Sequence, residues 1–276
     1  MPLFQEIESL HTGLAGVPAS WLTWSEEAQD FLAMWRQISN QLPKPPLVRL
    51  LGGQDYDYTY TLDPSPLLDD RSLEKIRAFA AEFLALSVGE SIWFVSDLLG
   101  PNLDGPALHR LFGCVRHYLV ELTHEPMSAL YAPLSTVGTD AGDFPLHADL
   151  YIPQVLFNVF EAVPQDRSGA SLFLPVSVFE NILTSEVPEE VSGSLLRCLR
   201  EPIQQDSYER FFGLLHNRDA PWYGKLSRAL QRHQLKVKLI AGQGYLIHDR
   251  LWLHGRTAPR GGVSGNRLHR LVFQPS

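Results

Sequence analysis

The sequence predicts an α+β fold with a mainly β core of the jelly-roll type and with helices packed around it. Three observations support this prediction. Apolar residues recur at helical spacing before residue 90, and short runs rich in Val, Leu, Phe and Tyr follow after it, separated by Gly, Pro or Asp. A helix-like stretch at about residues 187–234 interrupts these runs and predicts a helical insert. Many short strands with helices outside them are typical of an antiparallel barrel or sandwich.

Residues 1–90 are expected to form a helical buttress against one face of the core. The first helix begins after the cap residue Ser25, has acids in its first turn, and ends at the proline-rich stretch 41–46. A second helix is expected at residues 72–86. The inner face of the first helix carries apolar residues at helical spacing, namely Ala28, Phe31, Leu32, Trp35 and Ile38.

The jelly-roll core is expected in residues 90–276. A strand at 91–95 and a helix at 107–122 come first. The strand-like runs that follow lie at residues 150–163, 170–174, 237–240, 244–247 and 267–273. We see no linker between these segments, so residues 1–276 are expected to form a single domain.

The composition argues against two kinds of partner. The net charge is −8, with 8 basic against 20 acidic residues before position 151 and 15 against 11 after it. An acidic chain argues against nucleic-acid binding, and a mildly basic second half suits either an anionic small molecule or plain surface composition. Neither a membrane-spanning apolar run nor a secretory signal is visible. Cys114 and Cys198 lack zinc-site spacing, so we expect buried, reduced thiols in a cytoplasmic protein.

His147, Asp149 and His254 are the candidate metal ligands. Residues i and i+2 of an extended segment point to the same side, so His147 and Asp149 can aim at one point. His254 follows about a hundred residues later, and Gly255 after it permits a close backbone approach or an unusual backbone angle beside a ligand. Two imidazoles and one carboxylate leave the remaining positions of an octahedral cation open, which is typical of non-haem Fe(II) oxygenases.

A late arginine adds a second candidate function to this end of the chain. The Arg270 guanidinium offers a place for the carboxylate of an organic cosubstrate. Its neighbour His269 is expected to face the opposite side of the same strand. His248 lies six residues before His254 and competes with it for the role of ligand.

Four segments, in order and spacing, resemble the Fe(II)- and 2-oxoglutarate-dependent dioxygenases, most closely the branch with taurine dioxygenase and clavaminate synthase. The match covers residues 144–274 and implies a double-stranded β-helix, which is a cupin-like jelly roll. Ser171 replaces a threonine of the family pattern, Asp249 stands where asparagine is more usual, and Asn266 occupies a position that is arginine in taurine dioxygenase. The four segments are HAD at 147–149, SGASLF at 168–173, HDRLWLHGR at 248–256 and RLHR at 267–270.

The resemblance implies an enzyme that uses Fe(2+), O2 and 2-oxoglutarate. His147, Asp149 and His254 would bind the metal, and Arg270, supported by the Ser171 hydroxyl, would hold the cosubstrate. Such an enzyme hydroxylates an unactivated C–H bond of a small-molecule substrate and releases succinate and CO2. An amino acid, a natural-product intermediate or a sugar acid would fit, and the candidate substrate contacts are Tyr151 and Arg256.

Two other functions stay open on the sequence alone. A non-catalytic jelly-roll binding protein would keep the fold and lack the chemistry. A different metal-dependent cupin enzyme would hold zinc or manganese with the same ligands. Iron content and conversion of 2-oxoglutarate to succinate distinguish the three possibilities.

Overall fold

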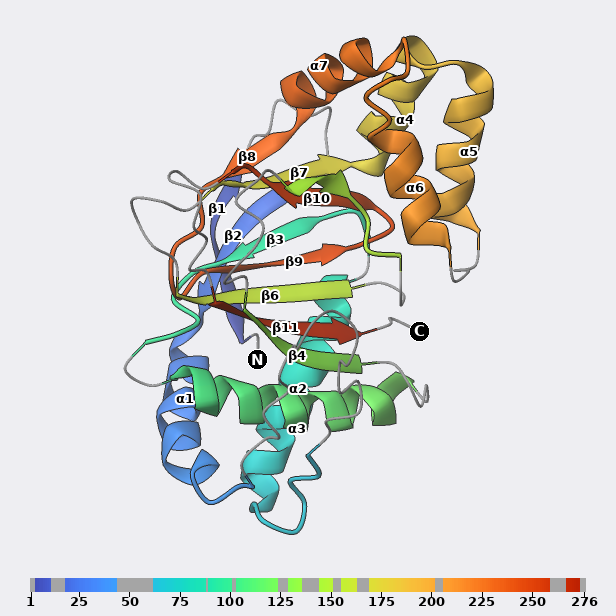
Figure 1. Cartoon of the computed structure of the whole chain (residues 1–276). Coiled ribbons are helices and arrows are strands. Elements are labelled where there is room, and N and C mark those ends of the chain that lie inside the picture. Colours follow the sequence, from blue (N-terminus) through green and yellow to red (C-terminus); the bar gives the residue numbers. More distant parts are fainter. Residues whose placement is uncertain are drawn as a thin grey trace.

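Two β-sheets lie between two groups of helices (Figure 1). The structure is a computed structural model that describes residues 3–10, 18–43, 62–87, 89–100, 103–123, 129–135, 144–150, 155–162, 169–201, 206–258 and 267–273. The large sheet has the strand order β1-β2-β3-β9-β6-β11-β4, and the small sheet has the order β5-β10-β7-β8. The strands are β1 (Phe4–Leu10), β2 (Ala19–Trp24), β3 (Ile92–Val95), β4 (Ala129–Ser135), β5 (Phe144–His147), β6 (Val155–Ala162), β7 (Ser171–Pro175), β8 (Leu235–Val237), β9 (Gly244–His248), β10 (Trp252–Arg256) and β11 (Arg267–Phe273).

From β4 to β11 the chain moves between the two sheets at every step but one, because only β7 and β8 are consecutive strands of the same sheet. All described strand pairs are antiparallel except the parallel pair β2 and β3. This connectivity brings β5 and β10 side by side, although about a hundred residues of chain separate them.

The sheets face each other across a shared aromatic core. Phe173 of the small sheet contacts Phe94 and Tyr245 of the large sheet, with ring centroids 5.4 and 4.8 Å away. Side chains alternate between the two faces of a strand, so the residues on either side of these rings point outward. Burial of these apolar surfaces between the sheets is the main force that holds them together.

Three helices cover the outer face of the large sheet: α1 (Glu26–Ser39), α2 (Asp70–Ser87) and α3 (Gly105–Thr123). The predicted start of the first helix is confirmed, because the Ser25 hydroxyl accepts a hydrogen bond from the Ala28 N–H at 3.2 Å. Trp35 is buried, and its indole N–H donates to the carbonyl of Ala107 at 2.9 Å, which ties α1 to α3.

Four helices cover the outer face of the small sheet: α4 (Val176–Glu186), α5 (Glu189–Arg200), α6 (Ser207–Leu215) and α7 (Tyr223–His233). This helical segment begins at Val176, eleven residues before the predicted insert at 187–234. The reason is that Pro175 ends β7 and stands at the N-cap of α4. The inner face of α4 then follows the helical period, with Val176, Phe179, Ile182 and Leu183 buried.

Residues 1–90 do not form a purely helical buttress, because β1 and β2 precede the first helix. They pair with each other, and β2 also pairs with β3, so they extend the large sheet at one edge. The rings of Phe4 and Trp24 stack at a centroid distance of 4.6 Å. Two runs of seven and six residues are short enough to be overlooked beside a fourteen-residue amphipathic helix.

Among the described residues, no helix combines the length and the apolar character that a membrane crossing needs. Both cysteines are free, but only Cys114 is buried, whereas Cys198 is half-buried and not buried as predicted. Burial raises the pKa of the Cys114 thiol, so this thiol is protonated and unreactive.

Candidate metal centre

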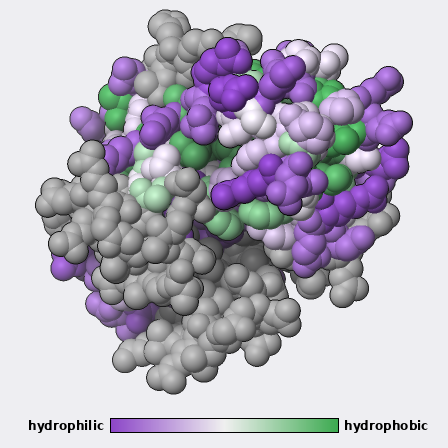
Figure 2. Space-filling view, turned by 45° about the horizontal axis from the view of Figure 1, so that its top comes forward, coloured by the Kyte–Doolittle hydropathy of each residue, from purple (hydrophilic) through white to green (hydrophobic). Residues whose placement is uncertain are grey.

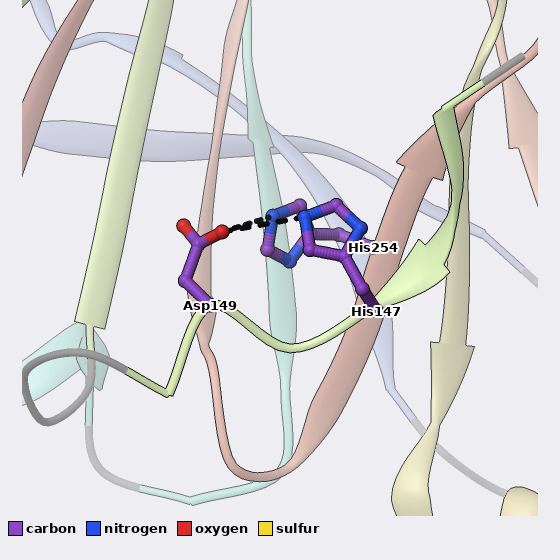
Figure 3. A group of neighbouring side chains, drawn as sticks. All are labelled: His147, Asp149 and His254. Atoms are coloured by element: carbon purple, nitrogen blue, oxygen red, sulfur yellow. Dashed lines mark ion pairs between the residues drawn. The ribbon is translucent and has the colours of Figure 1, made fainter. Parts of the chain in front are cut away.

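Three side chains, carried by β5, by the segment after it and by β10, converge on one point. His147 is the last residue of β5, Asp149 lies two residues beyond it, and His254 lies in the middle of β10. One ligand atom from each of them lies within 4.8 Å of the other two. The Asp149 Oδ1 atom is 3.3 Å from His147 Nε2 and 3.7 Å from His254 Nε2 (Figure 3). The structure thus brings together all three residues that the sequence nominated as ligands.

Strand pairing explains why the two imidazoles meet. His147 and His254 are direct partners in the antiparallel pair of β5 and β10, and partners of this kind point to the same face of a sheet. Their ring centroids are 4.4 Å apart. The neighbouring Leu146 and Leu253 point to the opposite face, where they pack into the core beneath α4–α7. Both histidines therefore lie on the inner face, between the sheets.

Gly255 makes the close approach of these two strands possible. A Cβ atom at this position would lie 2.6 Å from the carbonyl oxygen of Phe144 and 2.9 Å from that of Pro145, both backbone atoms of β5. The pairing of β10 with β5 is also irregular between His254 and Arg256. The prediction that Gly255 permits a close backbone approach is confirmed.

The ligand atoms fit a divalent metal ion. His147 Nδ1 lies 2.9 Å from the carbonyl oxygen of Pro145, so this nitrogen carries the proton and Nε2 is the one left to bind a metal. The Nε2 atoms of His147 and His254 are both buried, and neither forms a hydrogen bond within the described part of the chain. Buried polar atoms are normally satisfied. A cation beside the Asp149 carboxylate would satisfy both nitrogens at once.

Asp249 holds the ligand-bearing segments in place, a role that was not predicted from the sequence. The Asp249 carboxylate is buried and accepts hydrogen bonds from the backbone N–H groups of Asp149 and Leu150, each at 3.0 Å. Leu150 has a φ of 51°, a conformation that non-glycine residues rarely adopt. The Asp249 Oδ1 atom also lies 3.5 Å from His254 Nδ1. One carboxylate therefore supports the turn after His147 and the ring of His254.

The protonation states at this site suit metal binding. Burial, aided by the nearby His147, lowers the pKa of His254 to about 3, so its imidazole is neutral near pH 7. Burial alone would raise the pKa of Asp149, but Arg270, His254 and His147 outweigh it and hold this pKa well below its usual range. Burial and the charge of Asp149 raise the pKa of Asp249 to about 7.

Arg270 reaches the same point from the large sheet. Its Nη1 group donates to Asp149 Oδ2 at 2.8 Å, and its Nε group donates to Asn158 Oδ1 at 2.8 Å. Asn158 is its direct partner on β6. The predicted opposite orientation of His269 is found, since that ring lies 3.2 Å from Glu161 on the outer face. Arg270 therefore orients the predicted metal ligand Asp149, and this contact was not predicted from the sequence.

The other predicted site residues are less closely tied to this point. Ser171 begins β7 directly opposite Arg256 of β10, and both lie on the face of the small sheet that carries His254. Arg256 also lines the cavity described below. Tyr151, the second candidate substrate contact, lies outside the described residues. The competing His248 ends β9 and pairs with Val155 of β6, away from the cluster.

A cavity of about 800 Å³ adjoins the cluster beneath the helical segment α4–α7. Pro145 and Leu146, which directly precede His147, line it together with Phe212 of α6. The ring centroid of Phe212 lies 6.4 Å from that of His147. In Figure 2 the end of the molecule that carries α4–α7 is turned toward the viewer, and hydrophilic residues surround smaller hydrophobic areas there.

Comparisons with known proteins give solved structures alone, since no family model and no curated protein sequence matches this chain. One similar structure is an asparagine oxygenase in complex with Fe(II), 3-hydroxyasparagine and succinate. It is 12% identical, with 92% of this chain and 93% of that chain covered and a TM-score of 0.49. A second is the non-haem iron oxygenase OrfP in complex with Fe, which is 14% identical over 92% of this chain and 93% of that chain, with a TM-score of 0.44.

A third similar structure is PvcB from Pseudomonas aeruginosa, 14% identical over 72% of this chain and 79% of that chain, with a TM-score of 0.41. PvcB is described as an Fe, alpha-ketoglutarate dependent oxygenase from an isonitrile synthetic pathway. All three TM-scores are below 0.5. The function proposed below therefore rests on the geometry of the site.

Proposed function

We propose that this protein is an Fe(II)- and 2-oxoglutarate-dependent oxygenase that hydroxylates an unactivated C–H bond of a small molecule. The observation that carries the proposal is the meeting of two buried imidazole nitrogens and one carboxylate at a single point. Two histidines and one carboxylate bind one side of an octahedral cation and leave its other positions open for cosubstrate and O2. Arg270 beside them supplies a cation suited to an organic acid.

The strand order also supports this proposal. The sheet orders β4-β11-β6-β9 and β5-β10-β7-β8, with a chain that moves between the sheets, are those expected for a double-stranded β-helix. We also propose that residues 1–276 form a single domain. In this fold His147 of β5 and His254 of β10 lie buried on the inner face of the small sheet.

In the proposed mechanism, His147, Asp149 and His254 would hold Fe(2+), and Arg270 would pair with a carboxylate of 2-oxoglutarate. Bound iron with this cosubstrate would supply O2 activation, and the overall reaction would convert the substrate R–H, 2-oxoglutarate and O2 to the hydroxylated product R–OH, succinate and CO2. Ser171, on the face that carries His254, would offer a hydroxyl group to the cosubstrate. Arg256 and Tyr151 are the proposed substrate contacts, and an amino acid, a natural-product intermediate or a sugar acid would fit.

The chain's own groups prepare the site before any ligand binds. Asp149 is ionised and His254 is neutral, so neither has to lose a proton to a metal ion at pH 7. The Pro145 carbonyl accepts the His147 Nδ1 proton and so directs Nε2 to the metal. These contacts preorganise the ligands, which is the contribution that a protein makes to cofactor chemistry.

The test is iron binding together with succinate release by the full-length protein. We expect one Fe(2+) per chain, a weak visible band when 2-oxoglutarate is added without O2, and succinate release that depends on both. His147→Ala should abolish all three with the fold retained, as judged by circular dichroism. Arg270→Ala should still bind iron, but less tightly because Asp149 loses a hydrogen-bond donor. It should also raise the required concentration of 2-oxoglutarate by about 100-fold, because the cosubstrate carboxylate loses its charged partner.

The same measurements distinguish the other candidate functions. Tight binding of zinc or manganese, with no succinate released from the iron-loaded protein, would indicate a different metal-dependent cupin enzyme. A protein that binds no metal at all would be a non-catalytic jelly-roll binding protein. Full succinate release by His147→Ala would defeat the assignment of the metal centre.

A further inference from the structure

The described residues that line the cavity beside the metal centre carry positive charge. Three cationic side chains from different elements line it, namely Arg218 between α6 and α7, Lys236 of β8 and Arg256 of β10. None of the described residues that line it is acidic, although the chain has 31 acidic against 23 basic residues. Arg218 and Lys236 form no ion pair with any residue that the structure describes. Several cations that line one cavity favour an anionic ligand there.

The other walls of the cavity suit a small organic molecule. Phe212 and Leu230 provide apolar surface, and Ser227, Gln231 and Thr257 provide uncharged hydrogen-bonding groups. A volume of about 800 Å³ lies within the range of small-molecule sites. The combination fits a ligand with an apolar body and one anionic end.

Two residues that line this cavity, Phe212 and Arg256, lie near the metal centre. Phe212 lines the cavity, and its ring lies 6.4 Å from the ring of His147. Arg256 also lines the cavity, and it follows His254 by two residues on β10, so both side chains start from the same face of the small sheet. A ligand held here would touch Pro145, whose carbonyl oxygen accepts the His147 Nδ1 proton.

We propose that this cavity binds the anionic group of the substrate, a carboxylate or a phosphate, through Arg218, Lys236 and Arg256. The inference rests on the proposed oxygenase function only in naming the ligand as the substrate. Guanidinium and ammonium groups form charge-assisted hydrogen bonds with either anion. The ligand class narrows accordingly from small molecules in general to organic acids and phosphate esters.

Calorimetric titration of the full chain tests this proposal with three probes of one shape: benzoate, phenyl phosphate and the neutral benzamide. We expect at least one anion to bind about tenfold more tightly than benzamide, with an affinity that falls as salt is added. The tighter of the two anions identifies the carboxylate or the phosphate as the recognised group. The double variant Arg218→Gln, Lys236→Gln should lose about tenfold in anion affinity.

Two control proteins complete the test. Lys225→Gln, Arg232→Gln removes two charges from exposed positions of α7 that do not line the cavity, and it should bind the anions like the unaltered protein. Arg270→Ala should also keep anion binding, because the cavity is separate from the cosubstrate arginine. Equal binding of benzamide, equal affinities of the two double variants, or loss of binding in Arg270→Ala would each overturn the proposal.

The outcomes also separate this inference from the proposed function. Iron-dependent succinate release without anion binding would defeat the cavity proposal alone. Anion binding in the cavity by a protein that neither binds iron nor converts 2-oxoglutarate would defeat the oxygenase proposal alone.

Discussion

At the residue scale, Asp249 is the group on which the geometry of the candidate metal centre most depends. Its two oxygens accept the backbone N–H groups of Asp149 and Leu150, and it lies beside His254 Nδ1. These contacts join the segment after β5 to the turn between β9 and β10. A residue that binds no metal thus sets where two of the three ligands point.

Asp249→Asn should weaken metal binding, because the amide nitrogen of asparagine cannot accept a hydrogen bond and one backbone N–H loses its acceptor. We expect Fe(2+) affinity to fall by about 10- to 100-fold. Equilibrium dialysis under anaerobic conditions measures this affinity. Asp219→Asn is the matched control, since Asp219 is exposed, and it should bind iron normally. An Asp249→Asn protein with normal affinity would show that this carboxylate does not set the ligand geometry.

The sequence predicted the residues of the cluster but not the contacts that hold them. His147, Asp149 and His254 were nominated from side-chain chemistry and strand spacing, and they meet. Asp249 and Asn158 were missed as site residues because their roles depend on a backbone turn and on strand register, which no local pattern reports. An acid placed directly after the buried strand β9 is the signal that could have identified Asp249.

At the element scale, the pairing of β5 with β10 determines whether the two imidazoles meet, and Gly255 is its critical position. Gly255→Ala should shift the strands apart, because the new Cβ would lie 2.6 Å from a backbone oxygen of Phe144. We expect about 1 to 3 kcal/mol of destabilisation and weaker Fe(2+) binding. Urea unfolding and metal titration measure the two effects.

Gly213→Ala on α6 is the matched control for this substitution, because a Cβ there meets no atom within 4 Å. It should stabilise the protein by about 0.5 to 1 kcal/mol, since alanine is the better helix former. Normal iron affinity in both variants would contradict the role assigned to the strand contact.

The helices of this protein were easier to predict from the sequence than its short strands. Helices α1, α2 and α3 were predicted to within about two residues at most ends, since caps and a 3.6-residue period mark them. The strands β1, β2, β4, β5 and β10 were not among the predicted runs, and β8 begins two residues before the predicted run at 237–240. β10 has only five residues and follows directly on a polar turn, so no strand was predicted around His254. Short strands are specified by partners distant in the sequence, which a local window does not contain.

At the scale of the whole molecule, buried titratable groups make the stability of the metal-free protein depend on pH. Burial lowers the pKa of His109 to about 3, of His248 to about 4 and of His254 to about 3. These values lie below the value near 6.5 of an unfolded chain. Burial acts in the opposite sense on Asp249, whose pKa rises to about 7, above the value near 3.9 of an unfolded carboxyl group.

The direction of the pH effect follows from counting protons. Between about pH 6.5 and 4.5 the unfolded chain binds protons on three imidazoles that stay neutral when folded. The folded chain keeps one proton on Asp249 that the unfolded chain has lost. The unfolded state therefore binds about two more protons, and acid favours unfolding by about 1 to 3 kcal/mol per pH unit.

Urea midpoints of the metal-free protein should accordingly fall between pH 7 and pH 5.5. His109→Gln removes one buried imidazole far from the cluster in sequence. The free energy of unfolding should then depend less steeply on pH, by the contribution of about one bound proton. His233→Gln changes an exposed histidine of α7 and should leave the slope as it is. A midpoint that stays constant or rises on acidification would mean that the Asp249 proton outweighs the three imidazoles, which would place these histidines in more hydrated surroundings than the structure shows.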